Sequence, residues 1–173
     1  AACAKHFPGH GATVVDSHVA LPTVDEPLAV LRDRDLPPFA AVVSAGAKAV
    51  MTAHIRVPAL TGDLPATLSR AALVDLLRGD LGFTGVVVTD ALEMKGAAVV
   101  AGGIGPAAVR ALAAGADLLC LGAAVDADLI EHVAAWIATA IEDGRLSRER
   151  VEQAAQRVHD LARWLPGSSR GTA

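Results

Sequence analysis

The chain has 173 residues, a formal net charge of −4 and an apolar content of 53%, of which aromatic residues supply little. This length suits one domain whose core is built from small aliphatic side chains. The mean hydropathy of +0.43 is high, yet no stretch approaches the roughly 18 uninterrupted apolar residues that cross a bilayer. Acidic and basic residues alternate without long runs, which argues against a surface for nucleic acid or anionic membranes.

Four short apolar runs predict β-strands. The third is the clearest, because its valines follow Gly85 and end at Asp90, and β-branched residues favour strands. The predicted strands are Ala1–Ala4, Ala47–Ala53, Gly85–Thr89 and Leu118–Leu121. The first leads into Lys5-His6-Phe7 and a long polar loop that reaches about Pro22.

A helical pattern follows each predicted strand. Pro37-Pro38 suits a first helical turn, and Ser69 is a good N-cap. The predicted helices are Pro38–Ala45, Ser69–Gly79, Pro106–Ala114, Asp126–Asp143 and Ser147–Trp164. Residues 167–173 are rich in Gly and Ser, which predicts a disordered tail.

Strands buried on both faces and alternating with helices imply an α/β fold with a parallel sheet. Four such units suit either a small open sheet or half of an eight-stranded (β/α) barrel. Because Ala1 opens directly into a strand that ends at Lys5-His6, we expect no signal peptide and interpret the chain as a fragment. Cys3 and Cys120 are isolated in apolar segments, which favours buried free thiols over a metal site.

Charged residues gather where three successive strands end. Lys5-His6, His54 and Asp90 hold these positions, and the first loop adds Asp16 and His18. Parallel α/β folds bind ligands at this edge, so we expect a site there. His54 suits either the pocket or a structural role.

Asp16 and His18 are two residues apart, so a short turn would bring the carboxylate to the imidazole. Such a contact raises the pKa of the histidine and orients it for proton transfer. The alternative is a surface loop or an adventitious metal site.

Asp90 follows an apolar strand, so its carboxylate should be only partly solvated and able to act as a nucleophile on an anomeric carbon. The alternative is a helix N-cap, a favoured role for aspartate. Glu93 is interpreted as solvated. Lys5 suits two roles. Its side chain can neutralise a carboxylate or bind hydroxyl groups, or it can extend its charge into solvent.

Several segments, in order and spacing, resemble the signature of the β-N-acetylglucosaminidase subgroup of glycoside hydrolase family 3. They are Lys5-His6-Phe7-Pro8-Gly9-His10-Gly11-Ala12-Thr13, Asp16-Ser17-His18, Leu21-Pro22, Val50-Met51-Thr52-Ala53-His54, Pro65-Ala66-Thr67-Leu68-Ser69 and Leu81-Gly82-Phe83-Thr84-Gly85-Val86-Val87-Val88-Thr89-Asp90-Ala91-Leu92.

The resemblance implies a (β/α) barrel and retaining, two-step hydrolysis of terminal β-linked N-acetylhexosamine in peptidoglycan fragments or chitin-type oligosaccharides. It assigns the nucleophile to Asp90, the acid/base to His18 with support from Asp16, and the binding of sugar hydroxyls to Lys5 and His6. His10 is expected to support the loop. The family uses no cofactor or metal.

The resemblance also implies that residues 1–166 form the C-terminal half of the barrel, with about four βα units and further substrate-binding residues preceding Ala1. The chain alone is therefore expected to be inactive or barely active and prone to associate through its open sheet edges. A non-catalytic remnant, a family 3 β-glucosidase and a phosphorolytic relative are the alternatives. The compartment, cytoplasmic or exported, is left open by the sequence.

Overall fold

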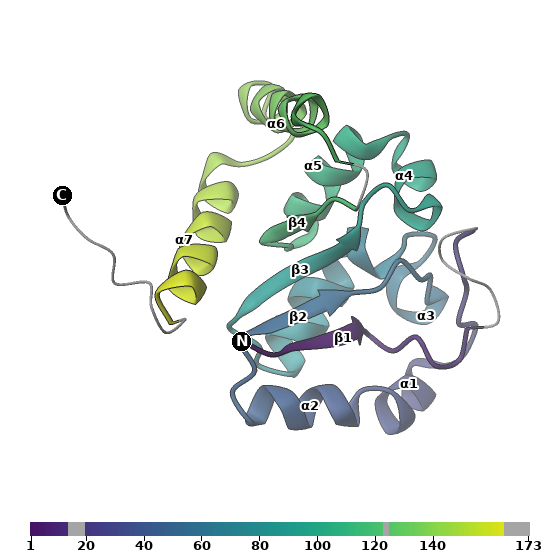
Figure 1. Cartoon of the computed structure of the whole chain (residues 1–173). Helices are drawn as coiled ribbons and strands as arrows, with labels where there is room; N and C mark the ends of the chain where they lie inside the picture. Colours follow the sequence, from purple (N-terminus) through teal and green to yellow (C-terminus); the bar gives the residue numbers. More distant parts are fainter. Residues whose placement is uncertain (14–19, 123–124, 165–173) are drawn as a thin grey trace.

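The computed structural model describes residues 1–13, 20–122 and 125–164. Its centre is a four-stranded parallel sheet in the order β1-β2-β3-β4 (Figure 1). The strands are β1 (Cys3–Phe7), β2 (Ala49–Thr52), β3 (Val86–Ala91) and β4 (Leu118–Cys120). Each strand is linked to the next by at least one helix, which confirms the predicted α/β fold with the parallel units of a partial (β/α) barrel. The predicted tail, 167–173, lies outside the described residues.

Two strands are longer at their carboxyl ends than their apolar runs suggest. Phe7 still pairs with Thr52, so β1 contains Lys5 and His6 instead of ending at Ala4 as predicted. The strand β3 likewise includes Asp90. The reason is that backbone pairing defines a strand, and pairing continues through the polar residues to Phe7 in β1 and to Ala91 in β3.

Helices cover the sheet, and there are more of them than the sequence predicts. They are α1 (Leu28–Arg34), α2 (Pro37–Ser44), α3 (Pro58–Thr61), the 3₁₀ turn η1 (Ala66–Leu68), the π-helix η2 (Ala71–Asp80), α4 (Lys95–Ala101), α5 (Ile104–Ala114), α6 (Ala127–Glu142) and α7 (Arg148–Trp164). The predicted helices correspond to α2, η2, α5, α6 and α7. No helix was predicted for the segments that form α1, α3, η1 and α4.

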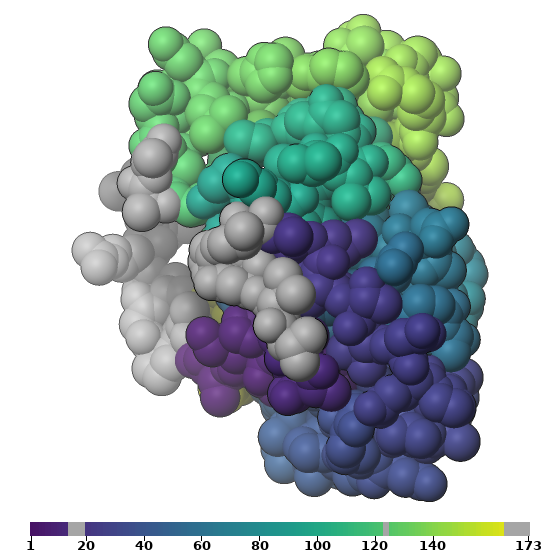
Figure 2. Space-filling view, turned by 90° about the vertical axis from the view of Figure 1, so that its right-hand side faces the viewer, coloured from purple at the N-terminus to yellow at the C-terminus, as the bar shows by residue number. Residues whose placement is uncertain are grey.

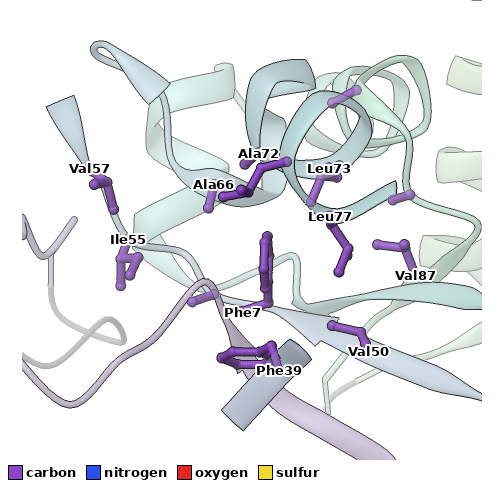
Figure 3. Packing of buried hydrophobic residues seen from close by; sticks show 14 of the residues in the cluster. Phe7, Phe39, Val50, Ile55, Val57, Ala66, Ala72, Leu73, Leu77 and Val87 are labelled. Atoms are coloured by element: carbon purple, nitrogen blue, oxygen red, sulfur yellow. The ribbon is translucent and has the colours of Figure 1, made fainter. Parts of the chain in front are cut away.

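The main core lies between one face of the sheet and the helices α2, η2 and α5. Val50 and Val87 point into it from neighbouring strands and are fully buried. Phe7 and Phe39 meet edge to face with ring centroids 5.2 Å apart, and Leu77 packs nearby (Figure 3). Edge-to-face contact is a preferred geometry for an aromatic pair.

The opposite face of the sheet is less covered than predicted. Met51 and Val88 pair with each other on that face and are only partly buried. The prediction of strands buried on both faces was therefore wrong for these positions. A barrel buries this face by closing on itself, whereas the described sheet has two free edges, β1 and β4.

A buried carboxylate anchors the last helix to the amino ends of the strands. Asp117 has no exposed side-chain area and pairs with Arg78 from η2 and with Arg150 and Arg157 from α7, at N–O distances of 2.5, 2.6 and 3.1 Å. Its Oδ2 also accepts the backbone N–H of Val87 at 3.0 Å. One acidic side chain therefore holds η2, β3 and α7 together.

Packing between α5 and α6 depends on a glycine. A Cβ on Gly105 would overlap the ring of Trp136. We expect Gly105→Ala to lower the free energy of unfolding by about 1–3 kcal/mol, because the ring must move out of a filled space. Urea unfolding would measure this. Gly79→Ala is the matched helical control, since its Cβ would make only an ordinary contact at 3.5 Å; an equal loss in both variants would contradict the packing argument.

Two further expectations concern the thiols and the membrane. Cys3 and Cys120 are both free, but Cys3 is exposed and Cys120 only half-buried, so the prediction of buried thiols was wrong. Open sheet edges explain this, because Cys3 lies in the edge strand β1 and Cys120 in the edge strand β4.

Among the described residues no single helix is long and apolar enough to cross a membrane. Only the pair α4 and α5, taken together, has the length and composition for a span, and the two helices are bent by 94° relative to each other.

Candidate active site

The carboxyl ends of the first three strands bring the predicted residues to one end of the sheet. His6 lies in β1 and Asp90 in β3, and His54 follows β2 by two residues. The Nε2 atom of His6 is 3.7 Å from Oδ2 of Asp90. Figure 2 views the molecule from the side toward which the strands point, with the purple N-terminal segment below the teal region of α4 and α5. Two residues 84 positions apart in the sequence therefore meet where the strand-end pattern predicted.

The two carboxylate oxygens of Asp90 have different surroundings. Its Oδ1 accepts the backbone N–H of Ala91 at 2.8 Å, whereas Oδ2 faces His6. The side chain is 23% exposed, so the carboxylate is partly desolvated and still accessible. Asp90 caps no helix, because α4 begins at Lys95 after Met94. The geometry leaves Oδ2 available for attack on a bound substrate.

His6 is suited to hydrogen bonding rather than to charge pairing. Burial lowers the pKa of its imidazole, and the nearby Asp90 opposes this effect. The positive charge of Lys5 and the ring of His10 lower the pKa further. A neutral imidazole has one donor and one acceptor nitrogen, which matches a sugar hydroxyl.

A cavity of about 440 Å³ lies beside β1. Lys5, His6 and His10 line it together with Asp35 and Phe39. Its volume falls in the usual range for small-molecule sites. Asp90 is not among the lining residues, so this cavity adjoins the candidate nucleophile without containing it. A second cavity, of about 310 Å³, lies at the opposite end of the sheet between α7 and the starts of β2 and β3.

The loop after β1 is held by a local contact. The Nδ1 atom of His10 is 2.8 Å from Oγ1 of Thr13, and that hydroxyl also donates to the carbonyl oxygen of His10 at 2.8 Å. These contacts agree with the expectation that His10 supports the loop. Asp16 and His18, the predicted acid/base pair, lie outside the described residues, so their roles stay predictions.

His54 is a buried structural residue, the second of the two roles that the sequence left open. It is 1% exposed. Its Nδ1 is 2.8 Å from Oγ1 of Thr67, and its Nε2 is 3.0 Å from the carbonyl oxygen of Ala91. Sequence reasoning missed Thr67 as a partner, although it lies within the Pro65–Ser69 segment on which the family resemblance partly rests.

Glu93 is exposed, as predicted, but it has a partner. Its Oε2 accepts the backbone N–H of Gly122 at 2.9 Å. A Cβ on Gly122 would collide with this carboxylate, so the close approach explains the glycine. Within residues 1–13, 20–122 and 125–164, no group of three His, Cys, Asp or Glu side chains could hold a metal ion.

Comparison with known proteins agrees with this arrangement. A sequence model described as "Glycosyl hydrolase family 3 N terminal domain" matches residues 1–161. The chain belongs to glycosyl hydrolase family 3.

Relatives of this family 3 chain carry hexosaminidase names. It is 37% identical to "Beta-hexosaminidase A" of Pseudoalteromonas piscicida over 98% of its length and 31% of that protein. It is 48% identical to a "Beta-hexosaminidase" of Chromobacterium violaceum over 68% of its length and 32% of that protein. The structure of a family 3 β-N-acetylglucosaminidase from Paenibacillus sp. superposes with a TM-score of 0.92 and 42% identity, covering all of this chain and 32% of that one. The family 3 chain thus spans about a third of the length of these relatives.

His54 should make the stability of this family 3 chain depend on pH. Burial lowers the pKa of its imidazole, and the Ala91 carbonyl and Asp90 oppose that shift only in part. The unfolded chain, with an ordinary histidine pKa of about 6.5, therefore binds the proton first as the pH falls. Stability is fully present above that pH and is lost as the pH falls toward the folded-state pKa, by up to about 1.4 kcal/mol per pH unit.

Urea unfolding between pH 8 and pH 5 would measure this effect. We expect His54→Gln to flatten the pH dependence relative to wild type. The exposed His159 offers a control, and His159→Gln should keep the wild-type slope. Identical slopes for wild type and His54→Gln would show that burial of this imidazole does not govern the acid limb.

Proposed function

We propose that this chain supplies the nucleophile and acid/base of a retaining β-N-acetylhexosaminidase. The observation that carries the proposal is the carboxylate of Asp90, with Oδ1 held by the Ala91 amide and Oδ2 beside His6. Family 3 membership and the hexosaminidase names of the relatives support the same reaction class.

In the first step, Oδ2 of Asp90 attacks the anomeric carbon of the terminal sugar and the bond to the leaving oxygen breaks. The leaving oxygen takes a proton, for which His18 is the proposed donor, oriented by Asp16. The product is a covalent glycosyl ester on Asp90. A nucleophilic carboxylate that is only partly solvated suits this step.

In the second step, a water molecule attacks the same carbon and the ester bond to Asp90 breaks. His18, now unprotonated, accepts the proton of that water, which restores both groups. Two inversions at one carbon give net retention. A histidine donor also keeps a second carboxylate away from Asp90, where like charges would oppose each other's ionisation.

Lys5 and His6 are the proposed contacts for the sugar hydroxyls. Both line the cavity next to the nucleophile, and a cation and a neutral imidazole together offer donors and an acceptor to hydroxyl groups. The proposed substrates are oligosaccharides with terminal β-linked N-acetylglucosamine, such as peptidoglycan or chitin fragments.

The test uses this chain co-expressed with the N-terminal barrel segment of the Paenibacillus relative. We expect the complex to hydrolyse 4-nitrophenyl β-N-acetylglucosaminide, to prefer it over the glucoside, and to release first the β-anomer in proton NMR. Preference for the glucoside would indicate a β-glucosidase, and a sugar phosphate formed in phosphate buffer would indicate phosphorolysis. A soluble, folded complex without activity on either substrate would favour a non-catalytic remnant.

A further inference from the structure

Ala91 links the candidate nucleophile to the interior of the fold. Its N–H donates to Oδ1 of Asp90 at 2.8 Å, and its carbonyl oxygen lies 3.0 Å from Nε2 of His54. The next amide, Leu92 N–H, donates to the carbonyl of Cys120 in β4 at 3.0 Å. The peptide group between Ala91 and Leu92, which directly follows the N–H that binds the carboxylate, is therefore held by His54 through its carbonyl and by β4 through its N–H.

The hydrogen-bond partners of His54 determine its tautomer. A carbonyl oxygen can only accept, so Nε2 carries the proton and donates to Ala91. The other ring nitrogen, Nδ1, lies 2.8 Å from the Thr67 hydroxyl, which also donates to the carbonyl oxygen of Ala53 at 3.0 Å. The Thr52 hydroxyl lies within hydrogen-bond distance of that of Thr67, at 2.7 Å. A relay of buried, hydrogen-bonded side chains thus connects Thr52 through Thr67 and His54 to the carbonyl of Ala91.

This relay is shielded from substrate and solvent. Thr52 and Thr67 have no exposed area, and His54 is 1% exposed. His54 does not line the cavity beside β1. A side chain with this burial cannot contact a sugar, so an effect on the reaction must pass through the backbone of Ala91.

We propose that His54 is a positioning residue of the glycosidase reaction: by holding the Ala91 peptide it fixes Oδ1 of Asp90 and directs Oδ2 toward the anomeric carbon. The inference rests on the proposed nucleophilic role of Asp90. A loosened Ala91 lets the carboxylate rotate, and a misplacement of about 1 Å in a reacting group costs on the order of 10²-fold in rate.

The first measurement needs no substrate. Amide hydrogen exchange at Ala91 in this chain should accelerate by about tenfold or more in His54→Leu. Local opening of the backbone then requires one hydrogen bond fewer to break, the bond from His54 to the Ala91 carbonyl. Thr61→Val is the matched control: Thr61 is also buried and its hydroxyl bonds to the backbone of Val57, yet Ala91 should exchange there as in wild type. Unchanged exchange at Ala91 in His54→Leu would overturn the proposal.

The second measurement follows labelling of Asp90 by a fluorinated N-acetylglucosaminyl fluoride in the co-expressed complex. We expect His54→Leu to slow labelling on the order of 10²-fold, with little change in the reagent concentration that gives half the maximal labelling rate. His54→Gln keeps a hydrogen-bond donor and should restore most of the rate. If His54→Leu and Thr61→Val have the same melting temperature and the same labelling rate, His54 contributes only to stability and does not position Asp90. Absence of labelling in wild type would contradict the role of Asp90, while hydrogen exchange would still decide the role of His54.

Discussion

Asp90→Ala should abolish glycoside hydrolysis by the co-expressed complex, with a loss of roughly 10⁴-fold or more in kcat. The expected reason is that the covalent intermediate forms on Oδ2, and no other described carboxylate is seen beside His6. The melting temperature should change little, because Asp90 is partly exposed and its contacts with the described residues are the neighbouring Ala91 amide and the 3.7 Å approach of His6. The measurement is release of 4-nitrophenol under saturating substrate.

Azide should distinguish the proposed nucleophile, Asp90, from the proposed acid/base, His18. In Asp90→Ala the vacated space admits azide, which attacks directly from the face that the carboxylate occupied and gives an α-glycosyl azide. In His18→Ala the ester on Asp90 should still form, azide should displace it, and the expected product is a β-glycosyl azide. Asp63→Ala, at a 99% exposed side chain, is the control and should retain wild-type turnover. A β-glycosyl azide from Asp90→Ala would assign the nucleophile elsewhere.

Asp117→Ala is expected to lower the free energy of unfolding by about 3–5 kcal/mol, the usual cost of breaking a buried ion pair by removing one partner. The three arginines that converge on this carboxylate would keep their charges without the anion. Burial already lowers the pKa of Arg78, and Asp117 counteracts that shift. Urea unfolding followed by circular dichroism would measure the loss.

The matched control is Asp80→Ala. Asp80 pairs with Arg32 at 2.7 Å, but both side chains are about half exposed, and such surface pairs contribute about 0–1 kcal/mol. Losses of the same size in the two variants would mean that burial of the Asp117 cluster adds nothing to the stability of the fold.

The sequence predicted the parts of the fold that local patterns determine. The valine run of β3 and the helices that became η2, α5, α6 and α7 are strong local signals. The short helices α1, α3 and α4 were missed because their patterns are brief and lie between Gly, Pro and charged residues. The end of β1 was misplaced because pairing with β2, a tertiary effect, extends that strand through polar residues.

The same division applies to the candidate site. The meeting of His6 and Asp90 followed from one topological rule, that carboxyl ends of parallel strands share an edge. The contacts of His54 with Thr67 and Ala91 did not, because they depend on how the segment after β2 folds back to place η1 beside the end of β3. The arginines around Asp117 were also missed, since residues 78, 117, 150 and 157 share no sequence motif.

The position of Asp117 has a consequence for engineering. The carboxylate of Asp117, which pairs with the arginines of α7, lies at the amino ends of the strands, before β4. Lys5, His6 and Asp90 lie at the carboxyl ends. Distant sites without shared partners rarely couple. The change in the free energy of unfolding caused by a mutation at the carboxyl ends should therefore nearly add to that of a stabilising mutation at the amino ends. A library randomised around Lys5 and the loop after it can accordingly be built on a background prestabilised near α7.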